Sequence, residues 1–168
     1  MPKTGRPMRT GKLKRRQAGF TYLTILFAIA VAGVTLAKTG IDWSQANQRE
    51  KERELLFVGD QYRQAIALFY ERTPGVIKRY PSRLEDLLSD TRYNPPQRYL
   101  RRLYRDPVTN QKWGVITAIE GGIMGVRSLS DATPIKSTNF SYADRSFEGE
   151  TKYSSWQFVY TPLPTLSK

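Results

Sequence analysis

Residues 20–37 read FTYLTILFAIAVAGVTLA, a run without a single charged side chain. Arg16 is the last charged residue before the run, and Lys38 is the first after it. At a rise of about 1.5 Å per residue, a helix of this length reaches the lower limit for crossing a bilayer. A helix packed on one side of a soluble domain keeps a polar stripe, whereas this run is apolar on every face. The run therefore predicts a transmembrane helix at residues 20–38.

The positive charge of the chain is concentrated ahead of this run. The sequence holds 27 Lys and Arg against 15 Asp and Glu, a formal net charge of +12. Seven of the cations and none of the acids precede Gly19, which leaves 20 cations against 15 acids, or +5, in the remainder. By the positive-inside tendency, the basic segment lies in the cytoplasm and the part after the span faces the periplasm. The sequence predicts a single-pass inner-membrane protein with a basic cytoplasmic leader at residues 1–19.

Residue types that perform catalysis are scarce in this chain. Cysteine and histidine are both absent, which excludes disulfides, thiolate or imidazole metal ligands, and catalysis by either side chain. Glu85 and Asp86 are neighbours, and on a helix their side chains point about 100° apart, which suits an acid and base pair poorly. No histidine is present to activate a serine, and Lys136 belongs to no catalytic motif. We expect that the protein is not an enzyme.

The segment after the span, residues 39–72, predicts an amphipathic continuation of the helix. From residue 43 onward it contains no proline, and its apolar residues recur at helical spacing: Leu55, Val58, Tyr62, Ala65, Ile66, Phe69 and Tyr70. The tripeptide Thr73-Pro74-Gly75 ends the helix, because proline removes a donor and glycine takes conformations that helices exclude. The apolar stripe must therefore pack on another element of the same chain.

Residues 73–168 mix short helical patterns with strand patterns. Ser82 and Glu85 stand in capping-box order ahead of a short apolar helix. Residues 97–105 interleave tyrosine and leucine with arginine, which predicts a short basic amphipathic helix.

The last third of the chain has the alternation of β-strands. Residues 113–118 and 123–128 flank a glycine-bearing turn and predict a hairpin. Trp156, Phe158 and Tyr160 recur at every second position, as in a third strand with one aromatic face, and we interpret them as core rather than as a ligand platform. A small sheet must bury one face on a helix. The predicted fold class is α+β: a long N-terminal helix, with a membrane-spanning half and an amphipathic half, packs on a small antiparallel β-sheet.

The junction before the apolar run carries a family resemblance. Residues 14–27 read KRRQAGFTYLTILF, which resembles the class III signal of type IV prepilins and type II secretion system pseudopilins. In that family a prepilin peptidase cuts a basic leader after its final glycine, and the new N-terminal residue is N-methylated. The resemblance implies cleavage after Gly19 and an N-methylated mature N-terminus at Phe20. An ordinary secretory signal is cut after its apolar region, whereas this cut retains residues 20–38 as a transmembrane and assembly helix.

Position 24 departs from the family pattern. The family commonly has a glutamate there, thought to neutralise the amino terminus of a neighbouring subunit, whereas this chain has Thr24. A buried amine that loses its charged partner is costly in a low dielectric. Minor pseudopilins thought to sit at a filament tip lack that glutamate. The departure therefore predicts a minor or atypical, tip-proximal pseudopilin.

Three later stretches also resemble secretion-type pseudopilins: YPSRLEDLL at 80–88, RYLRRLYRDPVT at 98–109 and WG at 113–114. The resemblance implies a structural and assembly role in protein secretion, with residues 73–168 as a periplasmic pilin-like domain. The implied partners are the inner membrane, other pseudopilins, the prepilin peptidase and the inner-membrane platform of the secretion system. Nucleic acid is not expected as a partner.

Other functions stay open at this point. The chain could be a minor pilin of a type IV pilus or of a competence system that binds DNA. It could also be a signal-anchored periplasmic binding protein whose leader stays uncut, or a conventionally secreted protein cut after Ala37. The mass of the mature N-terminus separates a processed pilin from an uncut chain and from one cut after Ala37. Steeply salt-dependent DNA binding would favour the competence alternative.

Two surface features have more than one interpretation. The arginines of residues 98–105 could bind lipid headgroups, an acidic partner or nucleic acid, but we interpret them as a solvated face that pairs with Asp106 or Glu85. No cofactor is expected, and calcium is the alternative, since some pseudopilins carry it in a C-terminal loop. The oxygen ligands would come from Asp106, Thr109 and Asn110 or from Asp131, Asp144, Glu148 and Glu150.

Overall fold

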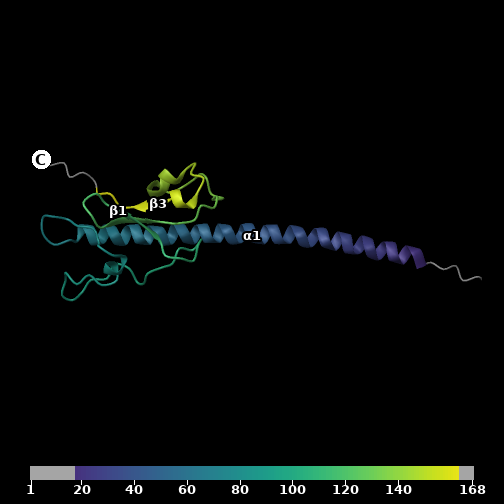
Figure 1. Cartoon of the computed structure of the whole chain (residues 1–168), viewed down its shortest axis with the longest axis horizontal. Coiled ribbons are helices and arrows are strands. Elements are labelled where there is room, and N and C mark those ends of the chain that lie inside the picture. Colours follow the sequence, from purple (N-terminus) through teal and green to yellow (C-terminus); the bar gives the residue numbers. More distant parts are fainter. Residues whose placement is uncertain (1–17, 163–168) are drawn as a thin grey trace, which may run out of the picture. The chain divides into compact units, whose positions relative to one another are not determined.

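The computed structural model of the chain describes residues 18–162, except for the side chains of residues 18–20 and 33–42. The chain divides into two compact units, Met1–Ser44 and Gln45–Lys168. The helix α1 (Ala18–Glu71) is followed by a 3-10 helix η1 (Leu84–Leu87) and then by the elements of a sheet. The prediction of an α+β fold with a long N-terminal helix and a small antiparallel sheet is confirmed (Figure 1).

The helix α1 ends where the sequence predicts. Its last residue is Glu71, and Gly75 adopts a positive φ of 86° in the turn that follows. The ammonium group of Lys78 donates to the carbonyl oxygens of Glu71 at 2.7 Å and Thr73 at 3.1 Å. The bond to Glu71 satisfies a carbonyl group that the end of the helix leaves without a partner.

The predicted membrane span at residues 20–38 includes side chains outside the described part of the chain. Among the residues that the structure does describe, no helix has the length and apolarity needed to cross a membrane.

The sheet has three antiparallel strands in the order β1-β2-β3: β1 (Gly114–Thr117), β2 (Ile123–Arg127) and β3 (Gln157–Val159). Strands β1 and β2 form the predicted hairpin, and Gly121 and Gly122 in its turn take φ values of 90° and 82°. The predicted third strand pairs with β2. The order leaves β1 at one edge of the sheet and β3 at the other.

The core of the second unit forms between the sheet and the apolar stripe of α1. Every stripe residue from Leu55 to Phe69 is buried, and Tyr70 is half-buried. A Cβ atom added at Gly59 would lie 2.5 Å from the Phe158 ring, so α1 and β3 approach closely at this glycine. The rings of Phe147 and Trp156 stack at 5.5 Å with an interplanar angle of 6°. Strands β1 and β3 lie on one side of α1, and the segment that follows the helix lies on the other (Figure 1).

Two local predictions in residues 80–105 are wrong. The capping interaction is made by Asp86, whose carboxylate accepts from the N–H of Arg83 at 2.9 Å, rather than by Ser82 and Glu85. Residues 97–105 form no helix. The N–H groups of Tyr99 and Leu100 donate to the carbonyl of Leu87, and Gln97 pairs with Asp90 in an isolated bridge, so long-range partners replace helical ones.

The long polar stretch before β3 is fixed to α1 through a buried carboxylate. It contains the 3-10 helices η2 (Tyr142–Phe147) and η3 (Tyr153–Ser155). Glu52 is only 4% exposed and accepts from the hydroxyl of Tyr153 at 2.8 Å and from the backbone N–H groups of Ile135 and Lys136. The donors satisfy a charge that burial would otherwise make costly.

Candidate functional site

The residues predicted to carry processing and assembly lie in the N-terminal part of α1. Gly19 and Phe20 fall within the helix, and the Phe20 side chain is outside the described residues. The side chain of Thr24 is exposed. Cleavage after Gly19 and methylation at Phe20 stay predictions.

The described N-terminal part of α1 exposes large apolar side chains in residues 21–32. Leu23 is 65% exposed, Phe27 71% and Ile29 63%. Exposed apolar residues are common singly, but contiguous ones mark surfaces that another protein or a membrane covers. By contrast, the apolar stripe of residues 55–69 is covered by the chain's own sheet. The two stretches therefore differ in what they pack against.

Several of the predicted calcium ligands, namely Asp106, Asp131 and Asp144, bond to other side chains of the protein. Asp106 is fully buried and accepts from the hydroxyls of Thr109 and Ser128, each at 2.7 Å. Asp144 pairs with Arg63 at 2.9 Å, and Asp131 lies 3.5 Å from the ammonium group of Lys152. In the part of the chain that the structure describes, no three acidic side chains are grouped to hold a metal ion.

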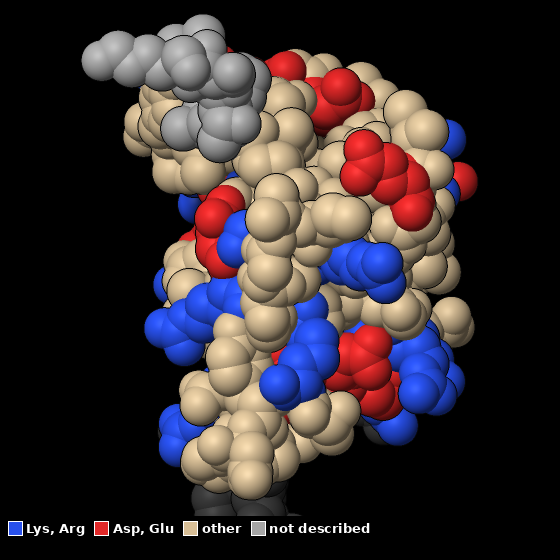
Figure 2. Space-filling view, turned by 90° about the vertical axis from the view of Figure 1, so that its left-hand side faces the viewer, with Lys and Arg blue, Asp and Glu red and all other residues tan. Residues whose placement is uncertain are grey.

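The arginines of residues 98–105 form an exposed basic surface, which we call the basic stretch and extend to Lys112. Arg98, Arg101, Arg102, Arg105 and Lys112 are all exposed. The predicted pairing with Asp106 is wrong, because that carboxylate is buried and satisfied by Val108, Thr109 and Ser128. Figure 2 shows Lys and Arg gathered over the lower half of one face of the molecule, with a few Asp and Glu among them.

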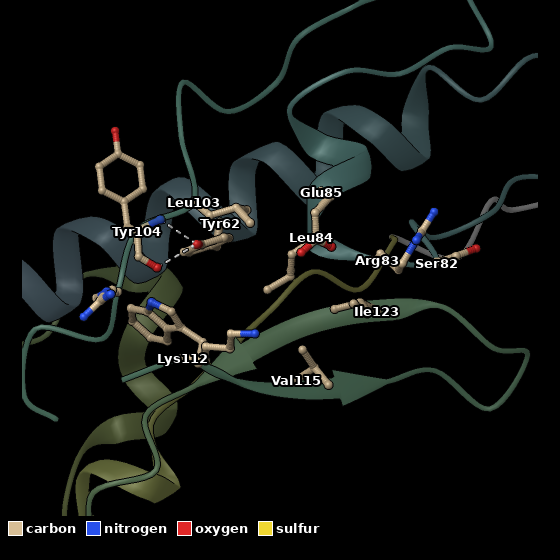
Figure 3. Close-up of a pocket in the computed structure, with 12 residues that line it drawn as sticks. Tyr62, Ser82, Arg83, Leu84, Glu85, Leu103, Tyr104, Lys112, Val115 and Ile123 are labelled. Carbon is tan, nitrogen blue, oxygen red and sulfur yellow. Dashed lines mark hydrogen bonds between the residues drawn. The ribbon is translucent and has the colours of Figure 1, made fainter. Parts of the chain in front are cut away.

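A groove of about 400 Å³ lies beside the basic stretch, between η1 and the β1–β2 hairpin. Its apolar lining comes from Leu84, Leu103, Val115 and Ile123 (Figure 3). Its charged lining residues are Arg83, Glu85, Arg105 and Lys112. Val115 is 48% exposed although it lies in a strand, and β1 is an edge strand of the sheet that the structure describes. The groove therefore joins an apolar floor to a mostly cationic rim.

One end of the groove is closed by Tyr62, which reaches from α1 to residue 104. The Tyr62 hydroxyl donates to the Tyr104 carbonyl at 3.0 Å and accepts from the Tyr104 N–H at 2.9 Å (Figure 3). Burial raises the pKa of Tyr62 to about 12. The phenol is therefore neutral at ordinary pH and serves as a structural clamp. The sequence gives Tyr62 as a core residue but carries no signal for this bond, because its partner is a backbone group.

A second polar cluster that sequence reasoning missed closes the C-terminal end of α1. Arg92 donates to both carboxylate oxygens of Asp90, to the carbonyl of Phe69 and to the hydroxyl of Thr73. Its guanidinium also lies 3.7 Å from the centre of the Phe69 ring. Burial opposes ionisation of Asp90, but the hydrogen bonds from Arg92 and Tyr99 outweigh it and lower the pKa of this carboxyl group. The cluster holds residues 90–92 on the helix.

Comparison with known proteins finds no matching protein family, no matching curated protein and no matching solved structure.

Proposed function

We propose that the chain is a pseudopilin subunit of a type II secretion system, minor or atypical in kind, with a structural and assembly role in a filament. The observation that carries the proposal is the contrast along α1. Its N-terminal residues 21–32 expose apolar side chains, while its residues 45–71 form the core of an α+β unit. One helix thus combines a surface for neighbours with the scaffold of a folded domain.

The sequence around the start of this helix supports the same proposal. A basic leader that ends at Gly19-Phe20 resembles the processing junction of prepilins, and the apolar residues follow it directly. Cleavage at that point keeps residues 20–38 in the mature protein, where they anchor the subunit in the inner membrane and pack with the helices of other pseudopilins. Polymerisation from an inner-membrane platform would then move cargo mechanically, which requires no catalytic group in this chain.

In this proposal, Thr24 indicates that the subunit lies at the tip of the filament. A subunit inside the filament shaft needs a negative charge near the amino terminus of its neighbour, because an uncompensated buried amine is unfavourable. A tip subunit has no neighbour above it that requires this charge. Finding the wild-type chain along the shaft, together with a Thr24→Glu variant that changes neither assembly nor secretion, would overturn the tip position.

Site-specific cross-linking tests the assembly role. The chain has no cysteine, so a Leu23→Cys variant carries one thiol, on the exposed N-terminal part of α1. We expect this variant to form cross-links in the membrane to cysteines placed in the corresponding helix of other pseudopilins. The matched control is Thr138→Cys, at an exposed position in the second unit. Equal cross-linking at both positions, or none at residue 23, would contradict the proposal.

A further inference from the structure

The strand β1 is an open edge of the sheet. It pairs with β2 on one side, and no strand lies on its other side among residues 18–162, which the structure describes. An edge strand presents backbone N–H and C=O groups that can pair with another extended chain. Native proteins usually cover or charge such edges.

The hydrogen-bond alternation identifies which groups of β1 face outward. The N–H of Tyr160 donates to the carbonyl of Met124, so Met124 faces β3. In an antiparallel ladder the next residue, Gly125, faces the opposite way and bonds to its β1 partner Ile116. Val115 therefore directs its N–H and C=O away from β2, toward the open side of the sheet.

The side chain of the same residue lies in the groove. Val115 lines the groove together with Leu84, Leu103 and Ile123, and almost half of its surface is exposed. An extended segment that pairs with the edge of β1 presents every second side chain to this face of the sheet. The groove has room for such side chains, since its volume is about 400 Å³.

The charges around the groove favour a bound segment of one sign of charge. Arg83, Arg105 and Lys112 line it, and Glu85 is the one acid among the lining residues. The basic stretch adds Arg101 and Arg102 nearby, with no exposed acid between residues 98 and 112. The acid of that stretch, Asp106, is buried and bonded internally. The rim therefore attracts carboxylates and repels cations.

We propose that β1 and this groove form a docking site for an extended, acidic segment of another polypeptide, which adds to the sheet as a fourth strand beside β1. Backbone bonds to Val115 supply affinity, the groove receives the segment's alternate apolar side chains, and the cationic rim contacts its carboxylates. The inference deepens the proposed function, since it names the kind of partner that one face of the subunit receives.

A second copy of the chain is disfavoured as the occupant. Pairing of two β1 edges would bring two copies of the same cationic rim together, and like charges across an interface cost free energy. Each copy would contribute Arg105 and Lys112, while Glu85 is the sole acid lining each described groove. An acidic segment meets no such repulsion.

Fluorescence anisotropy of two labelled hexapeptides tests the site on the detergent-solubilised full chain. The probe alternates glutamate and valine, and its control alternates lysine and valine. We expect the acidic peptide to bind at least about tenfold more tightly than the basic one, because only the acidic peptide complements the rim. Equal affinity of the two peptides would overturn the proposal.

Two variants test separately what the β1 edge and the cationic rim contribute to peptide binding. Val115→Pro removes the outward N–H while leaving the β1–β2 ladder bonds intact, and we expect it to abolish binding of the acidic peptide. Lys112→Glu combined with Arg105→Glu keeps the edge and reverses the charge, so the basic peptide should become the tighter ligand. Unfolding curves of both variants establish that the fold is retained. Undiminished binding by Val115→Pro, or an unchanged preference after charge reversal, contradicts the site.

Self-association and the proposed function have distinct readouts. If unlabelled chain displaces the acidic peptide and forms a dimer that Val115→Pro abolishes, the occupant is a second copy and the proposal is wrong. Processing at Gly19 does not involve the groove. A failure of peptide binding therefore leaves the proposed function standing, and an unprocessed N-terminus leaves the docking site standing.

Discussion

The hydroxyl of Tyr62 bonds to both backbone groups of Tyr104, donating to its carbonyl at 3.0 Å and accepting from its N–H at 2.9 Å. Tyr104 lies in an irregular segment. The Tyr62 side chain gives it the two backbone hydrogen bonds that a neighbouring strand would supply in a sheet. The bond fixes one end of the groove beside β1. Together with the bonds from Tyr99 and Leu100 to the Leu87 carbonyl, it holds residues 98–105 on a path that is not helical.

A Tyr62→Phe variant should lose stability because two backbone groups lose their partner. The ring stays buried, so the cost is mainly that of the missing hydrogen bonds, about 1–3 kcal/mol in the free energy of unfolding. Urea unfolding followed by tryptophan fluorescence measures the change. Tyr142→Phe is the matched control, because Tyr142 is 86% exposed, and should change stability little. Equal effects of the two variants would contradict the clamp.

A Gly59→Ala variant tests the close approach of α1 and β3. In an exposed helix interior this substitution stabilises by up to about 1 kcal/mol. Here the added methyl group would meet the Phe158 ring at 2.5 Å, and overpacking a core costs about 1–3 kcal/mol. We therefore expect a net loss of stability in urea unfolding. Lys51→Ala, at an exposed position of the same helix, serves as the control, and a stabilised Gly59→Ala variant would refute the packing.

An Arg92→Ala variant should weaken the protein and change its response to acid. Asp90 is 2% exposed, and losing the charged donor leaves its carboxylate only partly satisfied, at a cost of about 1–3 kcal/mol. The pKa of Asp90 is lowered in the folded protein, so its contribution to stability is present above its ordinary value of 3.8 and is lost as the pH falls.

Unfolding free energies measured between about pH 2 and pH 6 check this dependence. The wild-type protein should lose stability as Asp90 becomes protonated, and Arg92→Ala should lose less over the same range. Parallel pH profiles of the two proteins would show that the ion pair does not set the pKa of Asp90.

Alkaline pH should destabilise the fold through its buried phenols. Burial raises the pKa of Tyr62 and of Tyr153 from 10.0 to about 12. The folded state therefore favours the neutral phenol, and this stabilisation is complete below pH 10 and is lost as the pH rises toward 12. Phenolate absorbance combined with urea unfolding measures both events. The stability of a Tyr153→Phe variant should fall less steeply with pH than that of the wild-type protein. An equally steep fall would show that Tyr153 does not contribute to the alkaline loss of stability.

The parts of the fold that follow from local pattern could be predicted from the sequence. The stripe from Leu55 to Phe69 repeats at helical spacing and is buried, and the Gly121-Gly122 pair sits in the expected turn. The alternation of Trp156 and Phe158 likewise marks strand β3 and its buried face. In each case the residues that carry the signal are close together in the sequence.

The parts that depend on distant partners could not be predicted in this way. Residues 97–105 have an amphipathic pattern, yet Tyr99 and Leu100 donate their N–H groups to Leu87 instead of forming helical bonds. The groove has the same origin, since Leu84, Leu103 and Val115 come from three segments that only the tertiary structure brings together. A residue pattern does not encode which backbone carbonyl a distant N–H will reach.

The intact mass of the chain purified from membranes of cells that contain a prepilin peptidase tests the central claim most directly. The account predicts a protein that begins at Phe20, lacks residues 1–19 and carries one additional methyl group. A Gly19→Val variant should keep the full leader. A wild-type chain that keeps residues 1–19, or one that begins after Ala37, would contradict the assignment as a pseudopilin.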